Sequence, residues 1–370
     1  MASSKKIAIV GAGVAGLALA IIATKQGHKV SLFERGDTVS TLGAGVTLWP
    51  NAMFVMQQIG LDNALRGMGG LPSMMRQFDP QGVLQTEFDI LAVNALCGLP
   101  SVTILRRDLM DLLMDTVASL DVNIRFNLSI TVADVMKLGR EFDLVVGADG
   151  RMNSVVRQTL YPDKVMPRYH GFVNVIGVSH QQESFLDNAI SDFRGTGQRF
   201  GIVPVNDGRC YWAGAWNAPI DKQRSQNAWF DELHQRFRDW PNQVKDVLHN
   251  SDSASMRHIF VHDIDPLPFW HQGNILLIGD AAHASLPTSG QGACQALEDA
   301  WHLSLMLREE DDMASALQRF YRQRCTKTSA AQMVGRQLAN KFFSGQPEPL
   351  LPATHISAKE LSHFWMQGLI

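Results

Sequence analysis

The chain has 370 residues, of which 45% are hydrophobic, and its formal net charge is −3. This length can bury a sizeable core and favours two interlocked domains. Charges of both signs are mixed along the chain and no long basic run occurs, which argues against nucleic acid as a partner. The four cysteines form neither a CxxC pair nor a metal-ligand spacing, so we expect a reduced, cytoplasmic protein without disulfides or a bound metal.

The N-terminal region contains a long uncharged run, from Ile7 to Thr24, preceded by two lysines. Such a run resembles a signal peptide or a membrane span. Three glycines interrupt it, however, and a second strand-like run follows at residues 29–33. We therefore expect a buried helix of a globular protein here and no association with a membrane.

The first three predicted elements form a strand–helix–strand unit. Residues 5–10 and 29–34 have the pattern of buried strands, and residues 14–25 between them that of a helix. A crossover of this kind is right-handed and joins strands of a parallel sheet. The chain therefore begins with an α/β arrangement.

A glycine-rich loop connects the first strand to this helix. Gly11 permits a tight turn, Gly13 lets the backbone approach a pyrophosphate, and Gly16 allows close packing of helix and sheet. Glu34 ends the second strand, where a carboxylate can accept both hydroxyls of an adenosine ribose. This order predicts a dinucleotide site, whereas a simple glycine-rich packing contact would leave Glu34 unexplained.

The remaining elements follow two patterns. Turn residues between about 72 and 100 predict an excursion into a second sheet. From about 161 to 272, short alternating runs predict antiparallel strands with one helix near 226–248. The other predicted elements are a buried strand at 142–146 and helices at 51–60, 106–119, 291–307, 313–343 and 357–367.

A second glycine cluster lies late in the chain. The apolar run 275–278 ends in Gly279-Asp280, and Pro287 precedes Gly290-Gln291-Gly292. This order predicts a strand, a turn and the start of a helix. Together with the first glycine loop it indicates a flavin held at both ends. The pyrophosphate would lie at the first loop, and the ribityl chain and ring at the second.

These segments, with three others, resemble the single-component FAD-dependent aromatic hydroxylases, the class A group that includes para-hydroxybenzoate and salicylate hydroxylases. The other three motifs are residues 43–52 (GAGVTLWPNA), 105–109 (LRRDL) and 143–150 (DLVVGADG), and the late segment extends through Glu298-Asp299-Ala300. The resemblance implies an α/β fold with a Rossmann-like FAD-binding domain, an inserted antiparallel-sheet substrate domain and C-terminal helices.

The resemblance also implies domain boundaries. The FAD-binding domain is expected at residues 1–72, 101–160 and 273–345, and the substrate domain at residues 73–100 and 161–272. Residues 346–370 would form a C-terminal tail with a helix. We expect this helix to cover the protein's own surface or a dimer contact rather than to dock another partner.

Several residues acquire roles from the resemblance. Arg106 would reach the FAD pyrophosphate, whereas Arg107 fits a solvated arginine. Asp280 would accept a ribityl hydroxyl, and the backbone N–H groups of residues 290–293 would face the flavin ring at a helix N-terminus. The residues expected to contact FAD are Gly11, Gly13, Ala15, Gly16, Glu34, Arg35, Val46, Arg106, Ile130, Asp280, Pro287, Gly290, Gln291, Gly292 and Ala293.

The sequence also bears on how the nicotinamide reductant binds and on the role of His283. Asp149-Gly150 lies in a segment that the family associates with FAD and reduced nicotinamide, and a purely structural turn explains it equally well. His283 is interpreted as a structural histidine rather than a catalytic one. No second GxGxxG loop follows a strand. We therefore expect NADH or NADPH to dock only transiently.

Candidates for substrate binding lie in the antiparallel region. Arg199 and Tyr211 resemble an arginine and a tyrosine that contact the purine in the bacterial FAD-dependent urate hydroxylases. A cation there would orient an anionic ring in a dry pocket. The alternatives are a surface hairpin arginine and a tyrosine that only packs the sheet. Trp212 and Trp216 fall on the opposite strand face from Tyr211, so at most one set lines the pocket.

The resulting prediction is a FAD-dependent and NAD(P)H-dependent monooxygenase that inserts one atom of O2 into an aromatic or heteroaromatic ring, in this family through a flavin C4a-hydroperoxide. Thr288-Ser289 stands where the urate hydroxylases have an acidic residue, so the predicted substrate is a small, anionic aromatic or heteroaromatic compound and urate itself is in doubt. The alternatives are a flavin-dependent epoxidase or reductase on the same scaffold, or a flavin-binding module without turnover. We expect a monomer or a homodimer.

Overall fold

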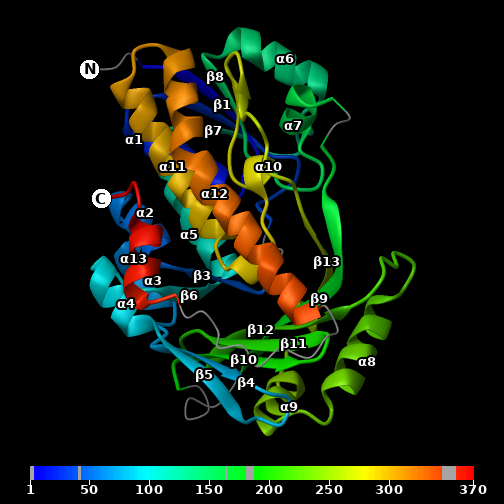
Figure 1. Cartoon of the computed structure of the whole chain (residues 1–370). Coiled ribbons are helices and arrows are strands. Elements are labelled where there is room, and N and C mark those ends of the chain that lie inside the picture. Colours follow the sequence, from blue (N-terminus) through cyan, green and yellow to red (C-terminus); the bar gives the residue numbers. More distant parts are fainter. Residues whose placement is uncertain (1–3, 41–42, 163–164, 181–186, 344–355) are drawn as a thin grey trace. The chain divides into compact units, whose positions relative to one another are not determined.

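The computed structural model describes residues 4–40, 43–162, 165–180, 187–343 and 356–370 (Figure 1). The chain divides into two compact units, and each is described by itself. Unit 1 comprises Met1–Thr41, Leu109–Arg168 and His262–Arg336, and unit 2 comprises Leu42–Asp108, Tyr169–Val261 and Gln337–Ile370. The boundaries of a cofactor-binding and a substrate-binding domain given above stay a prediction.

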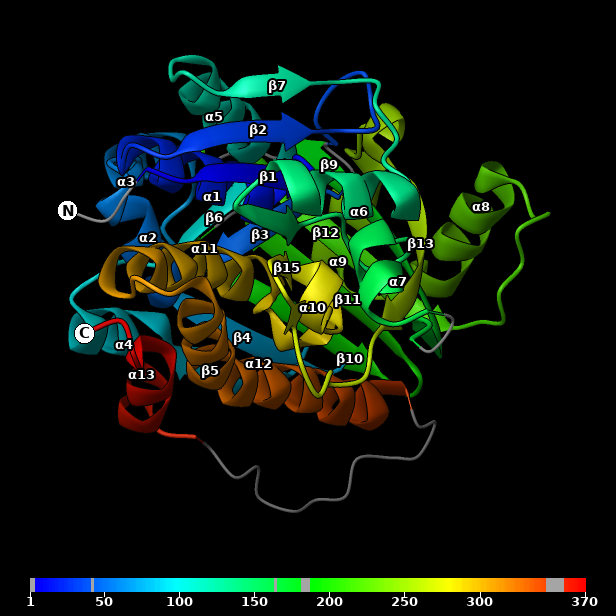
Figure 2. The ribbon, with the colours of Figure 1, turned by 90° about the horizontal axis from the view of Figure 1, so that it is seen from above.

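Unit 1 is built on a six-stranded sheet of order β14-β15-β8-β1-β2-β7. All neighbours pair in parallel except β14 and β15, and Figure 2 shows β7, β2 and β1 one beside the next. The strands are β1 Lys6–Val10, β2 Lys29–Phe33, β7 Asn123–Arg125, β8 Leu144–Gly147, β14 His271–Gln272 and β15 Ile275–Leu277. The predicted parallel strand–helix–strand unit is confirmed.

The helices of unit 1 explain the uncharged N-terminal run. Every residue of α1 from Val14 to Ala23 is buried, and this helix packs against α11. A helix enclosed on all sides needs apolar residues all round, so the run is a core helix. The helices are α1 Val14–Lys25, α6 Val132–Glu141, α7 Val155–Leu160, α10 Asp280–His283, η3 Pro287–Ser289 and α11 Gly292–Glu309, while α5 Arg106–Ala118 and α12 Met313–Phe343 continue into unit 2.

Unit 2 is built on a seven-stranded sheet of order β13-β9-β12-β11-β10-β4-β5. Its centre, from β9 to β10, is antiparallel as predicted, and β4 pairs with β10 in parallel. The strands are β4 Met74–Phe78, β5 Leu84–Asp89, β9 Arg168–His180, β10 Ala189–Gly195, β11 Gln198–Pro204, β12 Arg209–Asn217 and β13 Arg257–Asp263, with a separate two-stranded sheet of β3 Gly45–Leu48 and β6 Val102–Leu105.

One predicted helix of unit 2 is wrong. The region 226–248 contains two helices, α8 Gln226–Phe237 and α9 Asn242–His249, with Pro241 at the N-cap of the second. Proline lacks the N–H that a helix interior needs and its ring clashes with the preceding turn, so a single helix cannot run through it. The other helices of unit 2 are α2 Pro50–Gln58, α3 Asp62–Met68, α4 Ile90–Cys97, η2 Ser253–Ser255 and α13 Ala358–Met366.

The C-terminal helix α13 packs on its own unit. It contacts α4 and α2, and the Trp365 ring lies 4.8 Å from the Trp49 ring. Trp365 and Met366 are buried by these contacts. The expectation that this helix covers the protein's own surface is therefore confirmed. Among the residues that the structure describes, no helix has the length and apolar character needed to cross a membrane.

Candidate active site

The glycine loop of unit 1 has the geometry that its sequence predicts. Gly11 has φ +107°, and a Cβ atom on it would lie 2.4 Å from the carbonyl oxygen of Ala148. A Cβ atom on Gly16 would lie 2.0 Å from the carbonyl oxygen of Gly11. Both positions therefore require glycine, the first for its conformation and both for close packing.

Gly13 differs from its two neighbours in the loop. A Cβ atom on Gly13 would meet no atom within 4 Å, so the space beside the start of α1 is open. No side chain caps this helix and its first turn holds no acidic residue. The free N–H groups and the positive end of the helix dipole therefore face open space, which suits an anion such as a pyrophosphate.

Glu34 has two contacts that connect it to this loop. Its Oε2 accepts a hydrogen bond of 2.9 Å from the Ala12 N–H, and its Oε1 accepts one of 2.8 Å from the Gly36 N–H. An ionised carboxylate has about four acceptor positions, so each oxygen can accept a further hydroxyl. Glu34 thus fixes the glycine loop and keeps the acceptors that a ribose needs. The neighbouring Arg35 is exposed.

The late Gly-Asp turn lies beside the first glycine loop. A Cβ atom on Gly279 would lie 3.0 Å from the Cβ atom of Ala15 on α1, and Gly279 has φ +57°. Asp280 then begins α10, with its side chain partly exposed. The fold therefore brings together two segments that lie far apart in the sequence. Their donors and acceptors fit the pyrophosphate and ribityl hydroxyls of FAD.

A buried network of ion pairs supports this turn, and sequence reasoning missed it. Asp299 on α11 accepts hydrogen bonds from the Gly279 N–H at 2.8 Å and from Arg324 Nε on α12 at 2.8 Å, and it pairs with His283 Nε2 at 2.6 Å. Arg324 Nη1 also pairs with Glu298 at 2.5 Å, and Lys327 joins Glu298 at 2.9 Å. Figure 1 shows α12 running alongside α11.

The positive charges in this network keep Asp299 ionised. Burial alone raises the pKa of Asp299, but His283 and Arg324 more than offset burial and hold that pKa at about 2. Burial, with the charge of Arg324, lowers the pKa of the nearby His302 to about 3. His283 is buried and paired, which agrees with its interpretation as a structural histidine. The sequence signal for this network is Arg324, which lies on the apolar side of the helix predicted at 313–343.

The loop from Pro287 to Ala293 is held by its own hydroxyl groups. Thr288 Oγ1 donates to the Gly335 carbonyl at 2.6 Å, and Ser289 Oγ accepts from the Gln291 N–H at 3.2 Å. A Cβ atom on Gly292 would meet only Ser285 Oγ, at 3.9 Å, so the start of α11 is open there. Thr288 and Ser289 thus shape the loop, and an open helix N-terminus remains for a flavin ring.

Asp149 has structural partners. Its Oδ1 accepts from Ser154 Oγ at 2.6 Å and its Oδ2 from the Val156 N–H at 3.2 Å, at the start of α7. Burial raises the pKa of this carboxyl group. Arg157 donates to the carbonyl of Ala281 at 3.0 Å and so connects α7 with α10. Of the two interpretations of this segment, these contacts favour the structural turn.

In unit 2, Arg106 packs beneath a glycine. Gly43 has φ +122°, and a Cβ atom on it would lie 2.7 Å from Arg106 Cδ. The Arg106 N–H donates to the Ala44 carbonyl at 3.2 Å, whereas Arg107 is exposed and pairs with Asp108. Val46 lies in β3 of the same unit, and Ile130 lies partly exposed in a loop of unit 1.

Arg199 and Tyr211 lie on one face of the unit 2 sheet. In the β11–β12 ladder Val203 pairs with Tyr211 and Arg199 with Ala215, and side chains alternate along each strand. Arg199 and Tyr211 are therefore on the same face, which we call the Tyr211 face. Its members on β11 and β12 are Arg199, Gly201, Val203, Arg209, Tyr211, Ala213, Ala215 and Asn217.

The opposite face, which we call the Trp212 face, is core. Trp212 and Trp216 are fully buried there and pack against helices α8 and α9. Because Trp212 and Trp216 belong to the core, Tyr211 is the one of these aromatic residues that can line a substrate pocket. The Tyr211 ring packs on Gly45 of β3, where a Cβ atom would lie 2.1 Å from the ring, and its hydroxyl lies 2.9 Å from Thr47 Oγ1.

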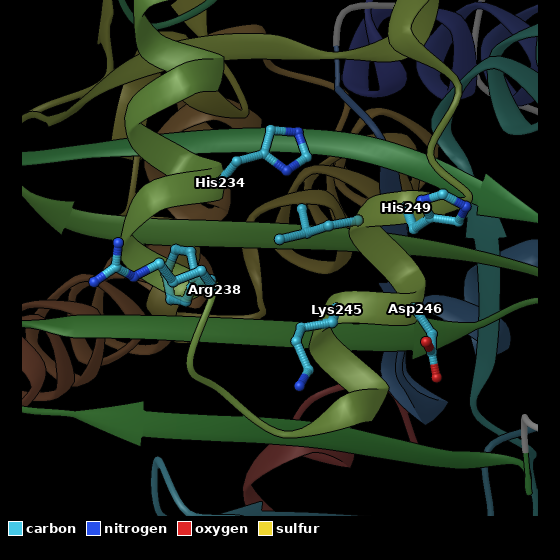
Figure 3. A pocket seen from close by; sticks show the side chains of 7 residues that line it. His234, Arg238, Lys245, Asp246 and His249 are labelled. Carbon is cyan, nitrogen blue, oxygen red and sulfur yellow. The ribbon is translucent and has the colours of Figure 1, made fainter.

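A groove between α8 and α9 lies outside the predicted site (Figure 3). Its lining includes His234 of α8, Arg238 directly after α8, and Lys245, Asp246 and His249 of α9. These helices cover the Trp212 face, so the groove is separated from Arg199 and Tyr211 by the sheet. None of the predicted site residues lines this groove, and no metal-binding cluster occurs among the residues described.

The comparisons with known proteins agree with this geometry. The FAD binding domain family matches residues 4–335 of the chain. The chain is 32% identical over 362 residues to the aurachin C monooxygenase/isomerase of Stigmatella aurantiaca, which covers 93% of this chain and 88% of that protein. It is 26% identical over 382 residues to the FAD-dependent urate hydroxylase of Klebsiella oxytoca, with coverage of 98% and 94%.

The fold has a solved counterpart. The crystal structure of Klebsiella pneumoniae HpxO complexed with FAD and uric acid matches with a TM-score of 0.81 at 24% identity, over 91% of this chain and 88% of that one. The fold and the site thus define a flavoprotein monooxygenase of the class A aromatic hydroxylase group. The chain belongs to the FAD binding domain family, and it uses FAD, NADH or NADPH, and O2.

Proposed function

We propose that this enzyme hydroxylates a small anionic aromatic or heteroaromatic compound that lies on the Tyr211 face. The observation that carries the proposal is the position of Arg199 and Tyr211 on one face, with Gly201, Ala213 and Ala215 beside them. Small side chains leave room for a flat ring, and the guanidinium supplies the positive charge that an anion needs.

We assign the FAD contacts to the two open helix starts and the carboxylates around them. In unit 1, Gly11, Gly13, Ala15 and Gly16 would hold the pyrophosphate, and Glu34 the ribose, with Arg35 and Ile130 at the edge. Asp280, Pro287, Gly290, Gln291, Gly292 and Ala293 would hold the ribityl chain and ring. The family resemblance assigns Val46 and Arg106 to FAD as well. These assignments rest on the open space at Gly13 and Gly292 and on the acceptors of Glu34 and Asp280.

The protein residues bind and orient the substrate in this proposal. The bound flavin, once reduced by NADH or NADPH, supplies the activation of O2. Arg199 would hold the anionic group of the substrate and so orient the ring. The Tyr211 hydroxyl, which lies 2.9 Å from Thr47 Oγ1, would accept a hydrogen bond from Thr47 and donate its own hydrogen to the substrate.

Replacing Arg199 with Met tests the assignment. We expect the variant to raise the apparent KM of the substrate by about tenfold or more, because a charge-assisted hydrogen bond is lost. NAD(P)H oxidation should become uncoupled and release hydrogen peroxide. The measurement is the ratio of hydroxylated product to NAD(P)H consumed, across phenols, hydroxybenzoates, hydroxypyridines and purines. Unchanged coupling would remove Arg199 from the substrate site.

The assembly and location belong to the same proposal. None of the four cysteines forms a disulfide, and three of them are buried. This usage supports a cytoplasmic protein. We propose a monomer or a homodimer, which light scattering coupled to size-exclusion chromatography distinguishes directly.

A further inference from the structure

On the Tyr211 face, one carboxylate accepts hydrogen bonds from two arginine side chains. Asp192 of β10 accepts from Arg199 Nε at 2.5 Å through Oδ1 and from Arg194 Nε at 2.7 Å through Oδ2. Arg194 and Arg199 are direct partners in the β10–β11 ladder, so their side chains lie next to each other. The Asp192 side chain is 4% exposed, whereas those of Arg194 and Arg199 are 20% and 30% exposed.

The charges of this cluster do not cancel. Burial raises the pKa of the Asp192 carboxyl, but Arg199 and Arg194 outweigh it, and the pKa lies below its usual value. One negative and two positive charges therefore leave a single positive charge in a partly buried place. Such a charge is costly without a counter-ion, which makes the cluster a receptor for an anion.

Both guanidinium groups keep donors for a ligand. An arginine has five N–H donors, and each of these two commits its Nε–H to Asp192. Within the described ranges of the chain, the terminal nitrogens of Arg194 and Arg199 have no hydrogen-bond acceptor. Arg199 Nη2 lies 3.7 Å from the position that a Cβ atom on Gly201 would take. The guanidinium group therefore lies next to Gly201 on the Tyr211 face.

A phenylalanine holds the two guanidinium groups in place. The Phe342 ring lies 4.3 Å from the Arg194 guanidinium carbon and 5.3 Å from that of Arg199. The next residue, Phe343, stacks on Phe172 at 4.2 Å, and its carbonyl accepts from Asn217 Nδ2 at 2.7 Å. The end of α12 is thus fastened to the sheet. Fixed arginines lose little conformational entropy when they bind a ligand.

We propose that Arg194 and Arg199 together bind a carboxylate group of the aromatic substrate, with Asp192 and Phe342 as positioning residues. This inference rests on the proposed function and deepens it, because it names the anionic group and adds Arg194 to the binding residues. Two adjacent guanidinium forks match the two oxygens of a carboxylate. A single phenolate or enolate oxygen would need only one of them. The ring would then extend over Gly201 and Ala213.

Paired acids and amides test the proposal on the FAD-loaded enzyme. The probes are benzoate, 1-naphthoate and quinoline-2-carboxylate, each with its primary amide, titrated by the change in flavin absorbance. We expect each acid to bind at least about tenfold more tightly than its amide. Arg194→Met should remove that preference by weakening the acid and leaving the amide within about twofold. Arg238→Met, at a 70% exposed arginine that directly follows α8, is the matched control and should change neither.

The outcomes separate this inference from the proposed function. Equal affinity of acid and amide in the wild-type enzyme, or no binding of any acid, overturns the carboxylate site without the use of any variant. Equal loss of acid and amide binding in Arg194→Met also overturns it, because that result indicates a structural arginine. The proposed function fails separately, if Arg199→Met leaves the coupling of NAD(P)H oxidation to hydroxylation unchanged.

Discussion

The flavin-loop region of unit 1 and the Tyr211 face of unit 2 use charged residues in opposite ways. In unit 1, the buried charges of Arg324 and Lys327 balance those of Glu298 and Asp299. Asp299 also accepts a hydrogen bond from the backbone of the Gly279 turn. On the Tyr211 face, Asp192 serves two arginines and leaves one positive charge unmatched. We infer that the first arrangement fixes the geometry of a cofactor loop and that the second binds an anionic substrate.

The largest expected effect comes from breaking the matched network. Arg324 is completely buried, so Arg324→Met removes the cation that two buried carboxylates share and leaves Glu298 with Lys327 and Asp299 with His283. We expect the free energy of unfolding to fall by about 3–5 kcal/mol and FAD to be lost on purification. Urea unfolding and the flavin content per chain measure both effects. Arg322→Met, on the exposed side of the same helix, should stay within about 0.5 kcal/mol of the wild type. A stable, FAD-loaded Arg324→Met enzyme would contradict this role.

A pair of glycine substitutions separates structure from cofactor binding within the loop. Gly16→Ala places a methyl group 2.0 Å from a backbone oxygen, so it should lower the free energy of unfolding by about 1–3 kcal/mol. Gly13→Ala meets no atom and has an ordinary φ of −83°, so the stability of the apoprotein should change by less than about 0.5 kcal/mol. Its FAD affinity should nevertheless fall about tenfold, because the methyl group fills the approach to α1.

Thermal unfolding of the two apoproteins and FAD titration measure this pair. Wild-type FAD affinity in Gly13→Ala would show that the pyrophosphate does not approach this face of the loop. An equal loss of apoprotein stability in both variants would also contradict the distinction.

The effect that is smallest near neutral pH is a dependence of stability on pH. The pKa of His302 falls from 6.5 to about 3 on folding, because it is buried near Arg324 and Lys327, and Asp299 offsets this only in part. Between these values the unfolded chain binds a proton that the folded chain does not. The free energy of unfolding should therefore fall, as pH drops from about 6.5 toward about 3, by up to about 1.4 kcal/mol per pH unit from this residue.

Replacing the histidine isolates its contribution. His302→Leu should make the decrease in stability below pH 6.5 shallower, whereas His234→Leu, at an exposed histidine of α8, should leave it unchanged. Urea unfolding at several pH values between 4 and 7 measures the slopes. Identical slopes for the wild type and His302→Leu would contradict the lowered pKa.

The sequence predicted those parts of the site whose residues are near one another in the chain. The glycine loop and Glu34 were recognisable because the turn, helix and strand that position them are consecutive. The Arg324 network and the cluster of Asp192, Arg194 and Phe342 were not, since their partners come from separate elements and no local pattern joins them. The break at Pro241 could have been predicted, because a proline within a helical pattern is itself a local signal.

The central claim is that this flavoprotein transfers one atom of O2 to an aromatic ring. The most direct test supplies the FAD-loaded enzyme with NAD(P)H, an aromatic acid that stimulates NAD(P)H oxidation, and ¹⁸O-labelled O2, and then measures the mass of the product. We predict one labelled oxygen per hydroxylated ring and a product yield close to the NAD(P)H consumed. A product without the label, or labelled oxygen recovered only as peroxide and water with every substrate, would contradict the account.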